Sequence, residues 1–218
     1  MKNVENSAAR YIPANPTIPR MRNAAKACRG CDLWKHATQT VFGEGPSKTR
    51  VLFVGEQPGD QEDLQGHPFV GPAGRILDRA LSEAGISRDD IYVTNAVKHF
   101  KSEPRGKRRI HKKPNAGEME ACKPWLEAEI RAVRPDIVVC LGATAAQSLL
   151  GRDFRVMTSR GQFVPFALGR LAVATVHPSS ILRMRDDESR HAAMRDFVND
   201  LKKVQSWLDR DARLKTGT

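Results

Sequence analysis

From Arg50 onward the chain alternates short apolar segments with longer amphipathic ones. Four short apolar runs, at residues 51–56, 90–97, 136–142 and 171–176, are typical of buried strands. Between the first two, the apolar spacing in PAGRILDRALSEAG predicts a helix that ends at Gly85. Strands that alternate with helices favour a mostly parallel sheet covered on both faces. We therefore expect an α/β protein, a three-layer α/β/α arrangement around a central, mostly parallel four-stranded sheet.

The remaining patterns fit one domain with weaker ends. Residues 115–133 have a helical pattern that Pro124 should kink or restart, and the last helix places its apolar residues on one stripe. The N-terminal segment is polar and contains prolines. We predict an arm over residues 1–26, a single domain over 27–210 and a frayed tail over 211–218.

Composition limits the class of protein. No apolar run approaches the roughly 18–20 residues that cross a bilayer, and the N-terminus has no apolar signal region. We expect a cytoplasmic protein. The net charge of +11 suggests a polyanionic partner, because Lys and Arg release counterions from a phosphate backbone. Basic residues that only keep the surface soluble would give the same composition.

The four cysteines suggest a metal site. Cys28 and Cys31 form a C-x-x-C, and Cys122 and Cys140 lie far downstream. In a reducing compartment such thiols favour metal ligation over disulfides, and four thiolates suit either zinc or an iron–sulfur cluster. In the alternative, Cys140 is a small buried hydrophobe and no metal binds. A redox C-x-x-C is disfavoured because the motif does not follow a strand.

Polar residues stand where the predicted strands end. Glu56 and Gln57 follow the first strand, Asn95 closes the second and His177 follows the fourth. Parallel sheets place their ligand sites at the carboxyl ends of the strands, so these side chains predict one site.

A glycine-rich loop, Gly55–Gly74, joins the first strand to the next helix. It is neither a Walker A motif nor G-x-G-x-x-G, which disfavours phosphate hydrolysis. Phe69, between polar neighbours, could stack on a base or pack in the core. After the fourth strand, Ser179 and Ser180 suit phosphate contacts, and either could cap a helix.

The segment Lys107–Lys113 carries five fixed positive charges around His111. A histidine in such a segment usually contacts DNA or is solvated.

Taken together, GEQPGD, PFVGPAGR, VTNAVKHF, KRRIH and HPSS resemble the uracil-DNA glycosylase superfamily. The chain is similar to its iron–sulfur branch, the family 4 enzymes. Within that branch it is most similar to the UdgX group, which has a Gln in the first motif and an inserted basic loop ending Arg-Arg-Ile-His. The resemblance covers about Ala27 to Arg183.

The resemblance implies a [4Fe-4S] cluster on Cys28, Cys31, Cys122 and Cys140, and a monomer that acts on uracil-containing DNA, with single strands favoured. Phe69 would stack on the flipped uracil, Asn95 would read its amide edge, and His177 would stabilise the leaving oxygen. Glu56, Gln57 and Gly55 would line the pocket, and His111 would attack C1′ and stay attached. The DNA contacts would be Lys107, Arg108, Arg109, Lys112, Ser179, Ser180 and Arg183.

That chemistry is physically reasonable. A neutral imidazole over C1′ would win against water through proximity, and neighbouring cations disfavour its protonation. Two alternatives remain: a family 4-type hydrolytic enzyme with turnover, and a non-catalytic iron–sulfur DNA-binding protein. The expected primary function is excision of uracil followed by a covalent link from His111 to the abasic site.

Overall fold

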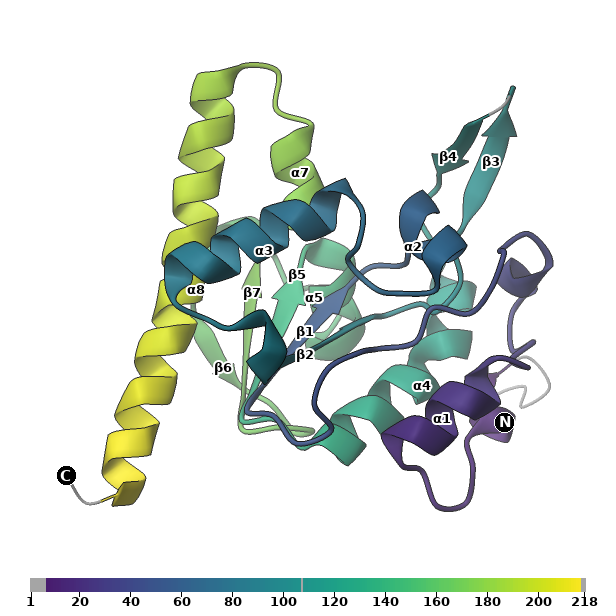
Figure 1. Cartoon of the computed structure of the whole chain (residues 1–218), viewed down its shortest axis with the longest axis horizontal. Helices are drawn as coiled ribbons and strands as arrows, with labels where there is room; N and C mark the ends of the chain where they lie inside the picture. Colours follow the sequence, from purple (N-terminus) through teal and green to yellow (C-terminus); the bar gives the residue numbers. More distant parts are fainter. Residues whose placement is uncertain (1–6, 107, 217–218) are drawn as a thin grey trace.

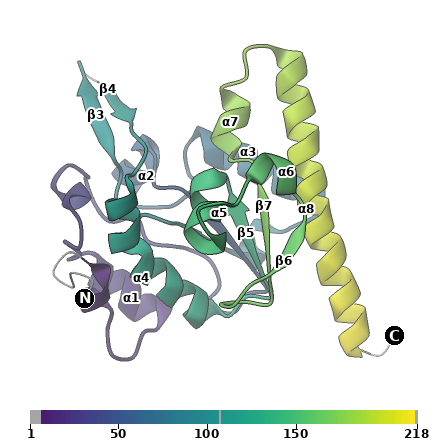
Figure 2. The same ribbon diagram turned by 180° about the vertical axis from the view of Figure 1, so that it is seen from behind.

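The computed structural model describes residues 7–106 and 108–216. Figures 1 and 2 show the chain from opposite sides. The sheet strands are β1 (Val51–Gly55), β2 (Ile91–Asn95), β5 (Ile137–Leu141), β6 (Phe163–Pro165) and β7 (Leu171–Thr175). The α-helices are α1 (Ile18–Ala25), α2 (Asp60–Gln65), α3 (Pro72–Ala84), α4 (Ala116–Val133), α5 (Ala143–Leu150), α6 (Val156–Ser159), α7 (Pro178–Leu182) and α8 (Asp187–Thr216). Short 3-10 turns lie at η2 (Ala8–Tyr11), η3 (Asp32–Lys35) and η4 (Arg88–Asp90).

The central sheet has five strands in the order β2-β1-β5-β7-β6. The four predicted strands pair in parallel, as expected. The prediction of four strands was wrong because β6 adds an antiparallel edge beside β7. That strand has three residues and ends in Pro165, so it is too short to give an apolar period. Its place at the edge is where proline is tolerated in a sheet.

Side chains alternate between the two faces of the sheet and build two apolar clusters. Leu52 and Val54 of β1 face the cluster under α1, α4 and α5, whereas Val51 and Phe53 face the cluster under α3, α7 and α8. This alternation follows from the period of two in a strand. The three predicted layers are therefore present, with helices on both faces (Figures 1 and 2).

Three details of the structure differ from what the sequence patterns predicted for the helices and the chain ends. α4 continues through Pro124 as one helix, with Trp125 and Leu126 fully buried just beyond it. α1 packs against α4 and buries Met21, so part of the expected arm belongs to the core. α8 continues to Thr216 over residues expected to fray, and Asp211 there makes ion pairs with Arg50 and Arg170. The boundaries at residues 26 and 210 remain predictions.

The predicted basic loop is a β-hairpin that projects from the body of the molecule (Figure 1). β3 (Ser102–Arg105) pairs with β4 (Arg108–His111) in antiparallel register, with Ser102 opposite His111. Gly106 at the turn has a φ of 60°, a left-handed conformation that glycine adopts without strain. In the sequence, this glycine between basic residues was the feature that indicated a turn.

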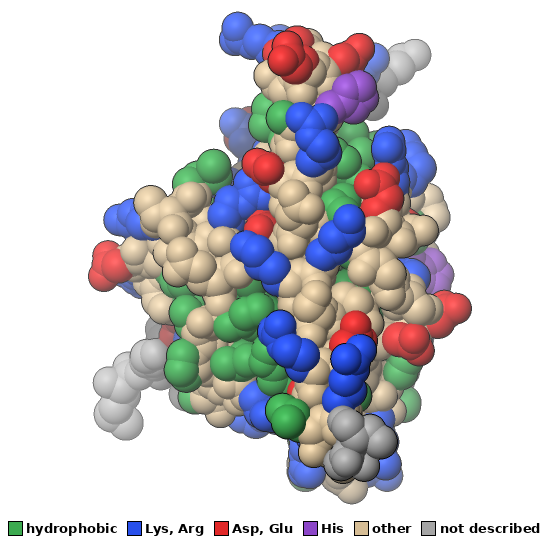
Figure 3. All heavy atoms as spheres, turned by 90° about the vertical axis from the view of Figure 1, so that its left-hand side faces the viewer, with side chains coloured by type: hydrophobic (Ala, Val, Ile, Leu, Met, Phe, Trp, Pro, Cys, Tyr) green, Lys and Arg blue, Asp and Glu red, His purple; other side chains and the backbone are tan. Residues whose placement is uncertain are grey.

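Positive charge is not confined to the hairpin. α8 runs along the side of the molecule away from the hairpin, and Lys and Arg side chains lie along it with Asp and Glu among them (Figure 3). Part of the positive charge therefore lies on α8, away from the hairpin. None of the helices in the described part of the chain is long and apolar enough to cross a membrane.

Candidate active site

Three polar residues predicted from the strand ends, Glu56, Asn95 and His177, lie at one edge of the sheet. Gly55 and Asn95 are directly paired at the carboxyl ends of β1 and β2, and His177 follows β7. A Cβ at residue 55 would lie 2.3 Å from Asn95 Oδ1 and 2.7 Å from Phe69 Cζ. Only a glycine at this position lets the amide of Asn95 and the ring of Phe69 approach the strand so closely.

Phe69 is held in an unusual backbone conformation. Its φ is 60°, in the left-handed region that costs a non-glycine residue about 1 kcal/mol or more. The residue is 6% exposed, and its ring stacks on that of His177 with centroids 6.3 Å apart and planes inclined by 28°. The fold therefore holds this ring at the sheet edge at some cost, as is common where a residue serves a ligand.

Asn95 is buried, and its side-chain amide is free. The residue is 3% exposed, and no hydrogen bond joins its side-chain amide to another group in the part of the chain that the structure describes. The amide is not among the fully buried unpaired groups of this part of the chain, so solvent reaches it. A carboxamide left free at a strand end suits recognition of a ligand that has both a donor and an acceptor.

His177 is a neutral donor at this edge. The backbone N–H of Ser179 donates to its Nδ1 at 3.1 Å, so in the neutral ring the proton lies on Nε2. Burial, followed by the charges of Arg183 and His111, lowers the pKa of His177 to about 4. His177 is also the N-cap of α7, so neither Ser179 nor Ser180 caps this helix as the sequence had suggested.

Glu56 connects the sheet edge to the hairpin. Its carboxylate accepts a hydrogen bond from the hydroxyl of Thr144 at the start of α5. Its Oε1 lies 3.5 Å from Nε2 of His111, whose side chain is half exposed. The hairpin therefore brings His111 to the same edge as Asn95 and His177. Thr144 was not predicted, since a threonine after a strand has no distinctive pattern.

The side chain of Gln57 faces the hairpin. Its amide nitrogen donates to the carbonyl oxygens of Lys112 at 2.9 Å and Lys101 at 3.3 Å, and its oxygen accepts from the Lys101 N–H at 3.1 Å. Lys101 precedes β3 and Lys112 follows β4, so one amide holds both ends of the hairpin. The place of Gln57 in a uracil pocket stays a prediction.

Arg109 fastens the hairpin to α2. Its Nε lies 2.7 Å from Asp60 and its Nη1 lies 2.6 Å from the fully buried carboxylate of Asp63. Burial is the largest single influence on the pKa of Arg109 and lowers it. The charges and hydrogen bonds of Asp63 and Asp60 together outweigh burial, so the pKa is raised. The guanidinium predicted to contact DNA is therefore already bound to two acids.

The other predicted DNA contacts lie on the surface of the hairpin and of α7. Arg108 is exposed, and Lys112 makes an ion pair with Glu103 across the hairpin. Ser180 donates to the carbonyl of His177, and Arg183 donates to the hydroxyl of Ser179. Lys107 lies outside the described residues.

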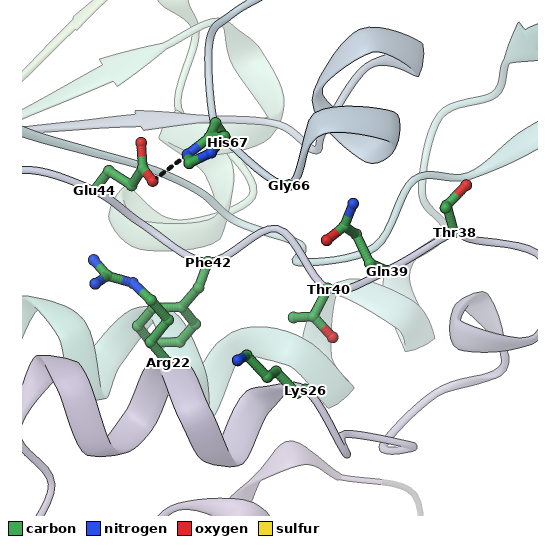
Figure 4. A pocket seen from close by; sticks show the side chains of 9 residues that line it. All are labelled: Arg22, Lys26, Thr38, Gln39, Thr40, Phe42, Glu44, Gly66 and His67. Carbon is green, nitrogen blue, oxygen red and sulfur yellow. Dashed lines mark hydrogen bonds and ion pairs between the residues drawn. The ribbon is translucent and has the colours of Figure 1, made fainter.

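A separate cavity lies between α1 and the segment 38–44 (Figure 4). Its wall includes Arg22, Lys26 and His67, and His67 makes an ion pair with Glu44 there. Neither Glu56, Asn95 nor His177 lines it. The candidate active site is the sheet edge and not this cavity.

The cysteines share one apolar cluster. Cys28, Cys122 and Cys140 are buried in the cluster under α4, and Cys31 packs against it. Trp125 Nε1 donates to Cys28 Sγ and the Lys98 N–H donates to Cys122 Sγ, each at 3.3 Å. Such N–H groups stabilise metal-bound thiolates.

The causes that raise the thiol pKa differ between Cys122 and Cys140. The pKa of Cys122 is raised to about 12 by burial and by the charges of Cys31 and Cys28, whereas that of Cys140 is raised to about 12 by burial alone. As the side chains stand, no three His, Cys, Asp or Glu groups among the described residues are arranged to hold a metal ion. The donor types and the shared cluster fit an iron–sulfur centre, but the side-chain arrangement does not by itself define one.

Comparison with known proteins assigns the family. The model of the uracil DNA glycosylase superfamily matches residues 42–202, most of the chain. This chain belongs to the uracil-DNA glycosylase superfamily. It is similar to the type-4 uracil-DNA glycosylase of Thermotoga maritima, with 38% identity over 187 residues that cover 85% of this chain and 92% of that protein.

Other glycosylases of the superfamily align over similar lengths. The type-4 uracil-DNA glycosylase of Archaeoglobus fulgidus is 36% identical over 186 residues, covering 82% of this chain and 86% of that protein. The type-5 uracil-DNA glycosylase of Pyrobaculum aerophilum is 31% identical over 184 residues, covering 76% and 77%. The region that the family model matches, residues 42–202, contains every residue of the sheet-edge site described above.

Proposed function

We propose that this glycosylase-family chain is a DNA repair enzyme that excises uracil from DNA by cleaving the N-glycosidic bond. The observation that carries the proposal is the convergence of three groups at one sheet edge: the ring of Phe69, carried by a left-handed backbone, the side-chain amide of Asn95 and the neutral imidazole of His177. A flat ring, a donor–acceptor pair and a single donor match the face, the amide edge and the leaving oxygen of uracil.

In this reaction the bond between N1 of uracil and C1′ of the sugar breaks, and the base leaves with the electron pair. Negative charge develops on the uracil oxygen, where Nε2–H of His177 stabilises it, and the carboxylate of Glu56 stabilises the cationic sugar. The base must first leave the stack, which costs a few kcal/mol and costs least in a single strand. We therefore propose single-stranded DNA as the favoured substrate. Separately, we propose that the active form is a monomer.

The fate of the sugar is a finer proposal: His111 captures C1′ and remains attached, as in the UdgX group. The 3.5 Å approach of His111 to Glu56 supports it, because a residue that only gripped phosphate would not need to lie against the site's carboxylate. One ring nitrogen forms the bond to C1′ while the other loses its proton, with Glu56 as the proposed acceptor. The effective molarity of a well-placed group can reach about 10⁵ M, enough to exclude water.

Hydrolysis with turnover is the second candidate. The similar glycosylases are named type-4 enzymes, and this fits the hydrolytic reaction better than it fits crosslinking. In that case a water attacks C1′, and His111 contributes to DNA binding only.

A denaturing gel separates the candidates. The chain is incubated with a uracil-containing single-stranded oligonucleotide, with a thymine-containing oligonucleotide as control. A uracil-dependent protein–DNA band supports capture, and the variant His111→Ser should lose the band while uracil release continues. Released uracil and free abasic DNA without any band would reject capture and support hydrolysis. DNA binding without base release would indicate a non-catalytic protein.

We also propose that Cys28, Cys31, Cys122 and Cys140 hold a [4Fe-4S] cluster with a structural role. When bound, the cluster would tie the segment before η3 to α4 and β5. The predicted readout is a brown protein that absorbs broadly near about 400 nm, with iron and sulfide in equal amounts. Cys140→Ser should reduce the iron content and the midpoint of thermal unfolding. A colourless, zinc-loaded protein from an anaerobic preparation would reject this proposal.

A further inference from the structure

A buried ionic network lies directly beneath the carboxyl end of β2. Lys98 and Glu129 are both fully buried, and Lys98 Nζ lies 2.5 Å from Glu129 Oε2. Two charges removed from water must be thoroughly hydrogen-bonded, because the cost of desolvation otherwise exceeds their attraction. A pair of this kind adds little net stability compared with apolar residues, so another use for it has to be considered.

The carboxylate of Glu129 is fixed from several directions. It accepts hydrogen bonds from the Gly43 N–H at 3.0 Å, from the Tyr92 hydroxyl at 2.9 Å and from the Thr94 hydroxyl at 2.9 Å. Burial raises the pKa of Tyr92 well above its usual value, so its hydroxyl remains a donor. α4 and two positions of β2 are thereby locked together around one anion.

The ammonium of Lys98 transmits this position to Asn95. It donates to the main-chain carbonyl of Asn95 at 2.6 Å and to the hydroxyl of Thr94 at 2.7 Å. No hydrogen bond fixes the side-chain amide of Asn95 within the described chain, so its position depends on its own backbone and on its packing at Gly55. The Lys98 N–H also donates to Cys122, so the same residue connects β2 to the cysteine cluster.

From this geometry we infer that Lys98, held by Glu129, is a positioning residue that orients the amide of Asn95 for the base. The inference rests on the proposed excision of uracil and adds to it a specific source of preorganisation. The buried cation holds the main-chain carbonyl of Asn95 at the strand end, and it thereby fixes the backbone from which the side-chain amide reaches the ligand. A displacement of about 1 Å in such a group can reduce a rate about 100-fold.

The test removes both charges together. Lys98→Met alone would leave Glu129 as an unpaired buried anion, so the double variant Lys98→Met/Glu129→Gln is used. Under single-turnover conditions with saturating uracil-containing single-stranded DNA, it should reduce the excision rate about 10- to 100-fold. Val204→Ala in α8 serves as a control for lost stability, and its rate should stay within about twofold of wild type at a temperature where both fold.

The distinguishing measurement repeats the double variant in an Asn95→Ala background. If Lys98 acts through Asn95, the additional loss of rate there should be less than about threefold, because interacting residues are not additive. An equal loss in both backgrounds, or no loss in the presence of Asn95, would overturn the inference. Should the double variant fail to fold, Thr94→Val removes one partner of the ammonium with almost no change of shape and should give a smaller loss of the same kind.

A second readout does not depend on catalysis. In a ¹⁵N-labelled protein, the side-chain NH₂ group of Asn95 should give one sharp pair of signals in the wild type. In the double variant this pair should be broadened or doubled. Unchanged signals would contradict the positioning role. If the wild-type protein released no uracil, the proposed function would fail, while these signals would still test the role of Lys98.

Discussion

The proposed uracil pocket (Gly55, Phe69, Asn95 and His177) lies at the same sheet edge as the β3–β4 hairpin, but different forces hold the two in place. The pocket is attached to strands with fully buried neighbours, and its groups approach one another through backbone contacts at Gly55. The hairpin has two strands, with only intermediate or exposed residues among those described. An isolated hairpin is marginally stable in water, so its position depends on its attachments.

Those attachments are polar and few. Arg109 binds Asp60 and Asp63 of α2, and Gln57 binds the chain on both sides of the hairpin. At these contact points the pocket should therefore be most sensitive to steric substitutions, and the hairpin should be most sensitive to polar ones. This contrast allows the proposed recognition of uracil to be tested separately from the proposed role of His111.

The largest expected effect is steric and falls on the pocket. Gly55→Ala places a methyl group within 2.3 Å of the Asn95 oxygen and 2.7 Å of the Phe69 ring, so one of them must move. We expect uracil excision to fall at least about 100-fold and the free energy of unfolding to fall by about 1–3 kcal/mol. Single-turnover release of uracil and urea unfolding measure these effects. Gly117→Ala, in the first turn of α4, should leave excision unchanged; wild-type excision by Gly55→Ala would refute the proposed pocket.

The next effect is polar and falls on the hairpin. Arg109→Ala leaves Asp63 buried without its cation and releases the hairpin from α2. The His111-dependent product should form about 10-fold more slowly, whereas uracil release should change less than about threefold. Arg105→Ala removes the same charge from an exposed position of the hairpin and is the matched control. Equal losses in product formation and uracil release would show that hairpin and pocket are not independent.

A smaller effect is expected at the other attachment. Gln57→Glu keeps the acceptor for the Lys101 N–H but removes the amide donor to the carbonyls of Lys101 and Lys112. Loss of these hydrogen bonds, each contributing about 1 kcal/mol, should slow the His111-dependent product about fivefold. Quantification of the product on a denaturing gel measures this rate, and Gln61→Glu, at an exposed position of α2, is the control. A greater loss for Gln61→Glu than for Gln57→Glu would contradict this assignment.

The smallest effect concerns pH. Burial, Arg183 and His111 lower the pKa of His177 from 6.5 to about 4, so between these values the unfolded chain binds a proton that the folded chain does not. The free energy of unfolding should therefore fall as the pH falls through this window. His177→Asn should reduce that dependence by up to about one proton. Urea unfolding from pH 7.5 to 4 measures it, with the exposed His191→Asn as control; equal slopes for wild type and His177→Asn would contradict the lowered pKa.

Much of the pocket was predictable because its determinants are local. Each of β1, β2, β5 and β7 is mainly apolar, and Glu56, Asn95 and His177 stand where these strands end. The glycine-rich loop and the C-x-x-C were likewise evident. The edge strand β6 was not, since three residues carry no period.

The amino-acid sequence by itself determined the layered α/β fold, the edge of the sheet where the site lies and the residue types gathered there. Apolar period and strand order are local properties, and parallel pairing brings the strand ends together. Tertiary structure alone decided what holds the site in place. Arg109 finds Asp60 and Asp63 across 49 and 46 residues, Gln57 finds Lys101 across 44, and Lys98 finds Glu129 across 31. Such polar contacts leave no periodic pattern, because each depends on where distant segments come together when the core forms.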